Sequence, residues 1–294
     1  MFESMCGLLP AFLLLGGIWP SLAGAPMRIR IGFEIAFECL APTSMILMLN
    51  IHPSRSRDLE TPATMIFDPV IQVRNHTDRL GNVASRIIAP AGILHVTSEA
   101  VVHDSGLPDP VVPDAEQSPV DDLPHEALEF LLGSRYCEVD RLSDIAWSLF
   151  GDTPPGWRRV QAICDYVHGR LRFSYADARS TRTAWEGHEE GLAVCRDFAH
   201  LAITLCRCMN IPARYCTGYL GDIGVPPVPD PMDFSAWFEA YLGDRWYTFD
   251  ARHNVPRIGR ILMARGRDAV DVALSTSFGP SRLAQFTVIT EELP

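Results

Sequence analysis

The chain has 294 residues, enough for one large domain or two ordinary ones, and its 47% hydrophobic content is that of a globular protein. A formal net charge of −11 argues against a concentrated basic face, so we expect no nucleic-acid partner. No metal-binding motif occurs in the sequence, and we expect neither a metal nor another cofactor.

The amino-terminal segment, residues 1–26, is either a poor export signal or an extension upstream of the fold. Residues 5–27 carry no charge, as in the apolar region of an export signal. The residues before them, however, include Glu3 and no Lys or Arg, whereas a signal would have a positive charge there. The eight cysteines show no disulfide-framework spacing, which favours reduced thiols and a cytoplasmic location, with export as the alternative. A stable membrane partner is expected only if residues 5–26 form an anchor.

Short apolar or alternating runs fill residues 27–105 and predict an N-terminal antiparallel β domain. In the first run, Ile29, Ile31 and Phe33 alternate with polar or small residues, as a strand with one buried face requires. Residues 106–123 are rich in Pro and Asp and predict a linker. Helical patterns and then strand patterns follow, so residues 124–294 are expected to form an α+β domain with C-terminal strands.

The segment "GLAVCRDFAHLAITLCRCMNIPARYCTGYL" predicts a buried helix followed by a strand. Phe198, Leu201 and Leu205 repeat at helical spacing, and Cys195 lies at or just before the helix start. A thiol at that position feels the positive end of the helix dipole, which favours the nucleophilic thiolate, although Asp197 partly opposes this effect. The alternative is a small core cysteine.

The segment "DFSAWFEAYLGDRWYTFD", residues 233–250, predicts a β-hairpin with a Gly-Asp turn. In this register Leu242 pairs with Arg245, and one face of the first strand is apolar. Ser235 lies on the other face, diagonal to Asp250. A histidine at position 235 could therefore bind the aspartate and present its second nitrogen to a thiol, as a Cys-His-Asp site requires.

These two segments, with "RIGRILMARGRDAVDVALSTSFG" after them, resemble the transglutaminase-like superfamily, in its bacterial branch of cysteine peptidases with an N-terminal β domain. The resemblance covers nearly all of the chain from Met27 onwards. It implies a papain-like core of helices packed on an antiparallel sheet, and a peptide or protein substrate. It also implies that Cys195 is the nucleophile, forming a thioester that water or an amine resolves, and that Asp250 is the orienting acid.

Ser235 departs from the family pattern, which commonly has histidine at this position. A serine cannot act as a general base near neutral pH and cannot form the imidazolium that stabilises a thiolate. Two hypotheses remain: a thiol enzyme acting on amide bonds, impaired by this change, and a catalytically inactive module that binds peptides or proteins. Nothing in the sequence selects an oligomeric state.

Four further residues have a bland and a functional interpretation. His253 has the wrong strand parity for the site and is predicted to be a loop residue, and His200 lies about 140° round the helix from Cys195 and is predicted to be packed. Trp185 and Trp237 are candidates for substrate binding, with core packing and a cross-strand aromatic pair as the alternatives.

Overall fold

A computed structural model describes residues 24–227 and 232–294, so the signal-like residues 1–23 lie outside the described part. The regular elements, in chain order, are β1 (Met27–Cys39), β2 (Thr43–Leu47), η1 (Pro53–Asp58), β3 (Ile66–Asp68), β4 (Arg74–Thr77), β5 (Val83–Ala89), β6 (Gly92–Asp104), η2 (Val120–Asp122), α1 (His125–Leu128), η3 (Glu129–Leu131), α2 (Val139–Phe150), α3 (Trp157–Arg170), β7 (Arg172–Phe173), α4 (Ala184–Glu190), β8 (Leu192–Ala193), α5 (Cys195–Cys208), β9 (Ala213–Tyr219), β10 (Ser235–Leu242), β11 (Arg245–Phe249), β12 (Ile261–Gly266), β13 (Ser275–Ser277) and β14 (Ser281–Leu293).

The β domain consists of two antiparallel sheets, with strand orders β14-β1-β6-β3 and β13-β2-β5-β4. The long strand β1 pairs with β6 along its whole length and with β14 on its other side. Its alternating side chains Ile29, Ile31, Phe33 and Ile35 are at most 2% exposed and pack in the core of this domain. The predicted β domain and its alternation are confirmed.

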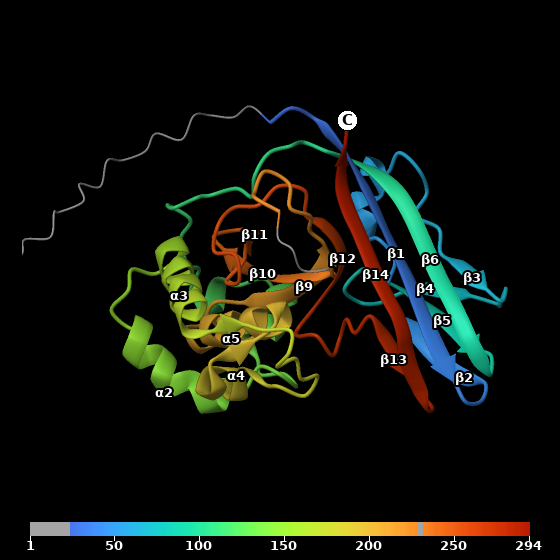
Figure 1. Ribbon diagram of the computed structural model, residues 1–294. Coiled ribbons are helices and arrows are strands. Elements are labelled where there is room, and N and C mark those ends of the chain that lie inside the picture. The colour runs from blue at the N-terminus through green and yellow to red at the C-terminus, as the bar shows by residue number, and fades with distance from the viewer. Residues whose placement is uncertain (1–23, 228–231) are drawn as a thin grey trace, which may run out of the picture.

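The two C-terminal strands belong to the sheets of the β domain. The sequence pattern grouped them with residues 124–294, but β13 pairs with β2 and β14 pairs with β1 (Figure 1). Alternation identifies a strand and its buried face, while the choice of partner strand depends on tertiary packing. Both ends of the described chain therefore meet in one sheet.

The second domain is a four-stranded antiparallel sheet, ordered β11-β10-β9-β12, with helix α5 packed on one face. Ala236, Phe238, Ala240 and Leu242 of β10 point to this face and are at most 3% exposed, which confirms the predicted apolar face of the hairpin. Helices α2, α3 and α4 surround α5, so the core sheet lies between the helices and the β domain (Figure 1). Within the described residues, no helix has the length and apolar character needed to cross a membrane.

Residues 106–123 run over the second domain and are fixed to it by main-chain hydrogen bonds. Asp109 N–H donates to Arg257, Trp157 N–H donates to the carbonyl oxygen of Ala115, and Gly243 N–H donates to that of Glu116, at 2.7–2.9 Å. The only regular structure in this stretch is the short η2 turn. The segment that the composition marked as a linker is thus anchored beside the hairpin that carries Asp250.

Candidate active site

Cys195 is the first residue of α5, as the sequence predicts. The preceding residue, Val194, is extended, and its N–H donates to Oδ2 of Asp197 at 3.1 Å. The same oxygen accepts a hydrogen bond of 3.0 Å from Nη1 of Arg182, and Asp197 is only 2% exposed. This buried ion pair fixes the first turn of the helix, and with it the position of the thiol.

The Cys195 thiol faces the start of β10. Its Sγ donates to the carbonyl oxygen of Phe234 at 3.9 Å. Burial raises the pKa of this thiol to about 11, although the charge of Arg252 and the N–H groups of Ala236 and Arg196 act in the opposite direction. Desolvation of the sulfur therefore acts against the helix start, which the sequence predicts to favour the thiolate, and has the larger effect on the pKa.

The hairpin has the predicted register. Leu242 lies opposite Arg245, and on the other side of β10, Ser235 pairs with Gly218 of β9. Ser235 is 5% exposed, and its Oγ has no hydrogen-bond partner among the described residues. A buried hydroxyl without a partner is costly and marks this position as one that a ligand, a water molecule or a moving side chain could satisfy.

Asp250 follows the last residue of β11 and is the centre of a buried network. Its Oδ1 accepts the main-chain N–H groups of Arg252 and His253, both at 3.0 Å, which folds the chain into a turn. Its Oδ2 accepts from Nδ1 of His253 at 2.8 Å and from Nη2 of Arg260 at 2.9 Å. Arg260 also donates to Asp109, at 2.8 Å.

The charge state of Asp250 follows from this network. Burial alone would raise the pKa of its carboxyl, but the Arg260 guanidinium and the hydrogen bond from His253 outweigh it and hold the pKa well below the usual range. The carboxylate is therefore ionised at neutral pH, as an acid that orients a base must be.

His253 is a loop residue, as predicted, but its ring contacts Asp250, which strand parity did not predict. The alternation of side chains ends with β11 at Phe249 and does not apply to the turn that follows. An aspartate directly after a strand commonly accepts N–H groups from the next residues and bends the chain back. The Asp-x-x-His spacing of Asp250 and His253 was the signal that could have identified this pair.

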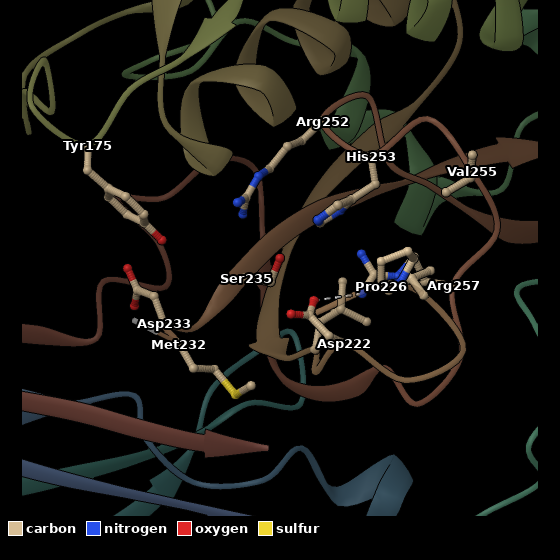
Figure 2. A pocket seen from close by; sticks show the side chains of 12 residues that line it. Tyr175, Asp222, Pro226, Met232, Asp233, Ser235, Arg252, His253, Val255 and Arg257 are labelled. Carbon is tan, nitrogen blue, oxygen red and sulfur yellow. Dashed lines mark ion pairs between the residues drawn. The ribbon is translucent and has the colours of Figure 1, made fainter. Parts of the chain in front are cut away.

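A cavity of about 340 Å³ lies beside the start of β10. Its wall includes Ser235, Arg252, His253 and Asp233, and Figure 2 shows their side chains around one central space. Arg257 also lines it and forms an ion pair of 3.5 Å with Asp222. The cavity therefore offers both signs of charge, a titratable ring and an unpaired hydroxyl next to the residue that binds the thiol.

The two tryptophans are not among the residues that line this cavity. Trp185, in α4, lies under the guanidinium of Arg141 at 4.5 Å. Trp237 is 3% exposed and packs with Cys216 and Leu262. Packing explains both positions, and substrate binding by either residue stays a prediction.

The other histidines near the site are engaged elsewhere. His200 is fully buried as predicted, stacks on Tyr136 at 4.9 Å, and accepts from Ala269 N–H through Nε2. His168 contacts the carbonyl oxygens of Ala251 and Arg252 through Nδ1 and so supports the turn after Asp250. Across residues 24–227 and 232–294, no group of three or more acidic, His or Cys side chains could hold a metal ion.

A cysteine at the start of a buried helix, packed on an antiparallel sheet whose strands bring a carboxylate to the same end, defines a papain-like cysteine fold. Residues 145–251 match the Transglutaminase-like superfamily. The crystal structure of a putative cysteine protease from Cytophaga hutchinsonii is 30% identical, and its TM-score is 0.79 over 92% of this chain and 91% of that one. The chain belongs to the transglutaminase-like superfamily, which confirms the resemblance seen in the sequence.

A shorter match joins this chain to a curated relative. ML0607 of Mycobacterium leprae is 37% identical over 83 residues, which are 27% of this chain and 29% of the relative. The match therefore covers less than a third of either protein.

Proposed function

We propose that this protein is a thiol enzyme that cleaves amide bonds in peptides or proteins through a thioester on Cys195. The observation that carries the proposal is the Asp250–His253 pair: the buried carboxylate holds a ring that lines the same cavity as Ser235, and the Cys195 thiol contacts the preceding residue, Phe234. A carboxylate that holds an imidazole beside a cysteine is the arrangement that thiol acyl chemistry uses. The likeness to a protein described as a cysteine protease supports the same reaction class.

The protonated state of Cys195 sets the order of events. Because burial raises the pKa of the thiol to about 11, the sulfur carries its proton until a substrate is in place. A base must then remove this proton as the sulfur attacks the carbonyl carbon. The N–H groups of Ala236 and Arg196 lower the pKa of the thiol, and we assign them as the donors to the carbonyl oxygen as it becomes an oxyanion.

The second candidate is a binding module that keeps the fold and has lost the chemistry. Two features favour it: Ser235 cannot act as the base, and burial raises the pKa of the Cys195 thiol, which disfavours the nucleophilic thiolate. Such a module would hold a peptide in the cavity beside Ser235 and release it unchanged.

One experiment separates the two candidates. The parent and the Cys195→Ala variant are incubated with a complex peptide mixture with and without hydroxylamine, and the products are identified by mass spectrometry. The enzyme is expected to give new peptide ends, and hydroxamates when hydroxylamine is present, in the parent only. Cys208→Ala, at the far end of α5, is the matched control and should retain the products.

An absence of products from the parent, together with equal peptide retention by the parent and Cys195→Ala, would establish the binding module and end the enzyme proposal.

A further inference from the structure

We propose that His253 supplies the base that position 235 lacks, and that it receives the proton of Cys195 through the hydroxyl of Ser235. The inference rests on the proposed function, because it names the group that makes Cys195 reactive. The proton transfer that a single histidine at position 235 would perform is divided between two residues: Ser235, the first residue of β10, and His253, in the turn after β11.

Asp250 holds the imidazole of His253 by a hydrogen bond. Nδ1 of His253 donates to Oδ2 of Asp250 at 2.8 Å, which leaves Nε2 as the acceptor of the neutral ring. Among the described residues, the ring of His253 forms a hydrogen bond through Nδ1 and none through Nε2. The ionised, almost fully buried carboxylate fixes the tautomer and stabilises the imidazolium that forms when Nε2 takes a proton.

Ser235 and His253 line the same cavity. Figure 2 shows the ring of His253 projecting into the cavity towards Ser235. The Ser235 hydroxyl is buried and has no partner among the described residues, so its donor and its acceptors are all available. A hydroxyl can donate its own proton to nitrogen while it accepts another from sulfur. Hydrogen bonds of this kind are often long without substrate and shorten when it binds.

The Cys195 thiol contacts the main chain next to Ser235. Cys195 Sγ bonds the carbonyl oxygen of Phe234, the residue immediately before Ser235. The thiol and the imidazole therefore approach the start of β10 from two directions. Arg252, next to His253 in the turn, is the positive charge that acts on the sulfur. Its guanidinium lies 3.9 Å from the ring centre of Phe173, which helps to hold it in place.

The proton and the bonds balance in each half-reaction. In the first, the sulfur proton passes to Ser235 Oγ, the Ser235 proton passes to Nε2 of His253, and the sulfur–carbon bond forms. The carbon–nitrogen bond then breaks, and the proton returns by the same route to the leaving nitrogen. In the second, water gives a proton to His253, its oxygen bonds the carbonyl carbon, and the sulfur–carbon bond breaks as the proton returns to Cys195.

The test follows alkylation of Cys195 by iodoacetamide, measured on the Cys195 peptide by mass spectrometry from pH 5 to pH 10. His253→Asn keeps an N–H donor for Asp250 and removes the base, and Ser235→Ala removes the relay. Each variant is expected to slow alkylation at least tenfold at pH 7.5. The rates should converge near pH 10, where hydroxide removes the proton. His76→Asn, exposed in β4, is the matched control and should behave as the parent.

Other charged groups surround the ring and must be separated from it. Asp222, Asp233, Tyr175, Arg252 and Arg257 line the same cavity, and Asp250 and Arg260 lie behind the ring. A pH dependence of the alkylation rate is assigned to His253 only if it disappears in His253→Asn. Equal rates for the parent and His253→Asn at both pH 7.5 and pH 10 would overturn the proposal.

Two further variants protect the test against simple loss of folding. Ser235→Thr keeps the hydroxyl and should alkylate within about threefold of the parent. The double variant Ser235→His with His253→Asn moves the imidazole to position 235 and should regain at least the parental rate, so slow alkylation in this correctly folded variant also argues against the proposal.

The alkylation rates and the peptide cleavage fail independently. If His253→Asn slows alkylation but the parent cleaves no peptide, the proposed function fails and the proton route stands. If cleavage depends on Cys195 and is unchanged in His253→Asn, the proton route fails and the function stands.

Discussion

Arg260 and Asp250 form an ion pair of 2.9 Å, between Nη2 and Oδ2, in which the arginine and aspartate side chains are 7% and 2% exposed. The same carboxylate oxygen accepts a hydrogen bond from Nδ1 of His253. One buried carboxylate therefore binds both the permanently charged Arg260 and the titratable ring of His253. The pair joins the turn after β11 to the residue before β12 and, through Asp109, to the segment 106–123. A change at Asp250 is therefore expected to affect stability as well as chemistry.

Asp250→Asn should lower the free energy of unfolding by about 1–3 kcal/mol at pH 7, because it removes one of the two counter-charges of the buried Arg260 and leaves only Asp109. The pKa of Asp250 is lower in the folded state than in the unfolded chain, so its stabilising effect is complete above the unfolded value, near 4, and is lost as the pH falls towards the folded value. Urea unfolding from pH 7 to pH 3 measures this.

The difference between parent and Asp250→Asn should be constant above pH 5 and shrink below pH 4. Asp244→Asn, on the exposed turn of the hairpin, is the control and should have little effect. A difference that grows on acidification would contradict the assigned charge state of Asp250.

Arg252→Gln should make Cys195 less reactive, because the positive charge of Arg252 lowers the pKa of the thiol. We expect alkylation at pH 8 to slow on the order of threefold to tenfold, which corresponds to up to one pKa unit. The effect should weaken as salt is added. Arg245→Gln, at the exposed hairpin turn, is the control, and faster alkylation in Arg252→Gln would show that the charge acts on the thiol with the opposite sign.

Removal of β14 should unfold the β domain, although the deleted residues lie at the carboxyl end. A chain ending at Gly279 leaves one edge of β1 without its partner strand and takes Val288, a core residue, away. We expect insoluble protein or a large loss of thermal stability. Removal of only Leu293 and Pro294 is the control, and an unchanged melting temperature for the longer deletion would contradict this role of β14.

Gly218→Ala should destabilise the core sheet next to the site. A Cβ at this position would lie 2.1 Å from the carbonyl oxygen of Ile261, so β9 and β12 would have to separate. We expect a loss of about 1–3 kcal/mol or more in thermal or urea unfolding. Gly169→Ala meets no atom within 4 Å, lies near the end of α3, and should be neutral or stabilising.

The sequence predicts the features that depend on neighbouring residues. The start of α5 at Cys195 and the pairing of Leu242 with Arg245 follow from helical spacing, alternation and turn chemistry. The raised pKa of Cys195 could not be predicted in this way, because it depends on which distant side chains enclose the sulfur. The Asp250–His253 contact was missed because strand alternation was applied to a turn.

The pairing of β14 with β1 also could not be predicted from the local sequence pattern. Arg30 in β1 and Glu291 in β14 form a hydrogen bond across 261 residues of sequence, and nothing near either residue identifies the other. Alternation and apolar runs marked both segments as strands, but only the packed domain decides that they are neighbours.

The pairing of β1 with β14 also affects the order in which parts of the protein can fold during synthesis. β1 precedes the other described strands in the chain, and one of its edges has no partner strand until β14 has been made. The helices and the sheet of the second domain are complete in the nascent chain before that moment. Since domains generally fold as units during translation, we infer that the second domain can fold while β1 still has one unpaired edge, to which a chaperone could bind.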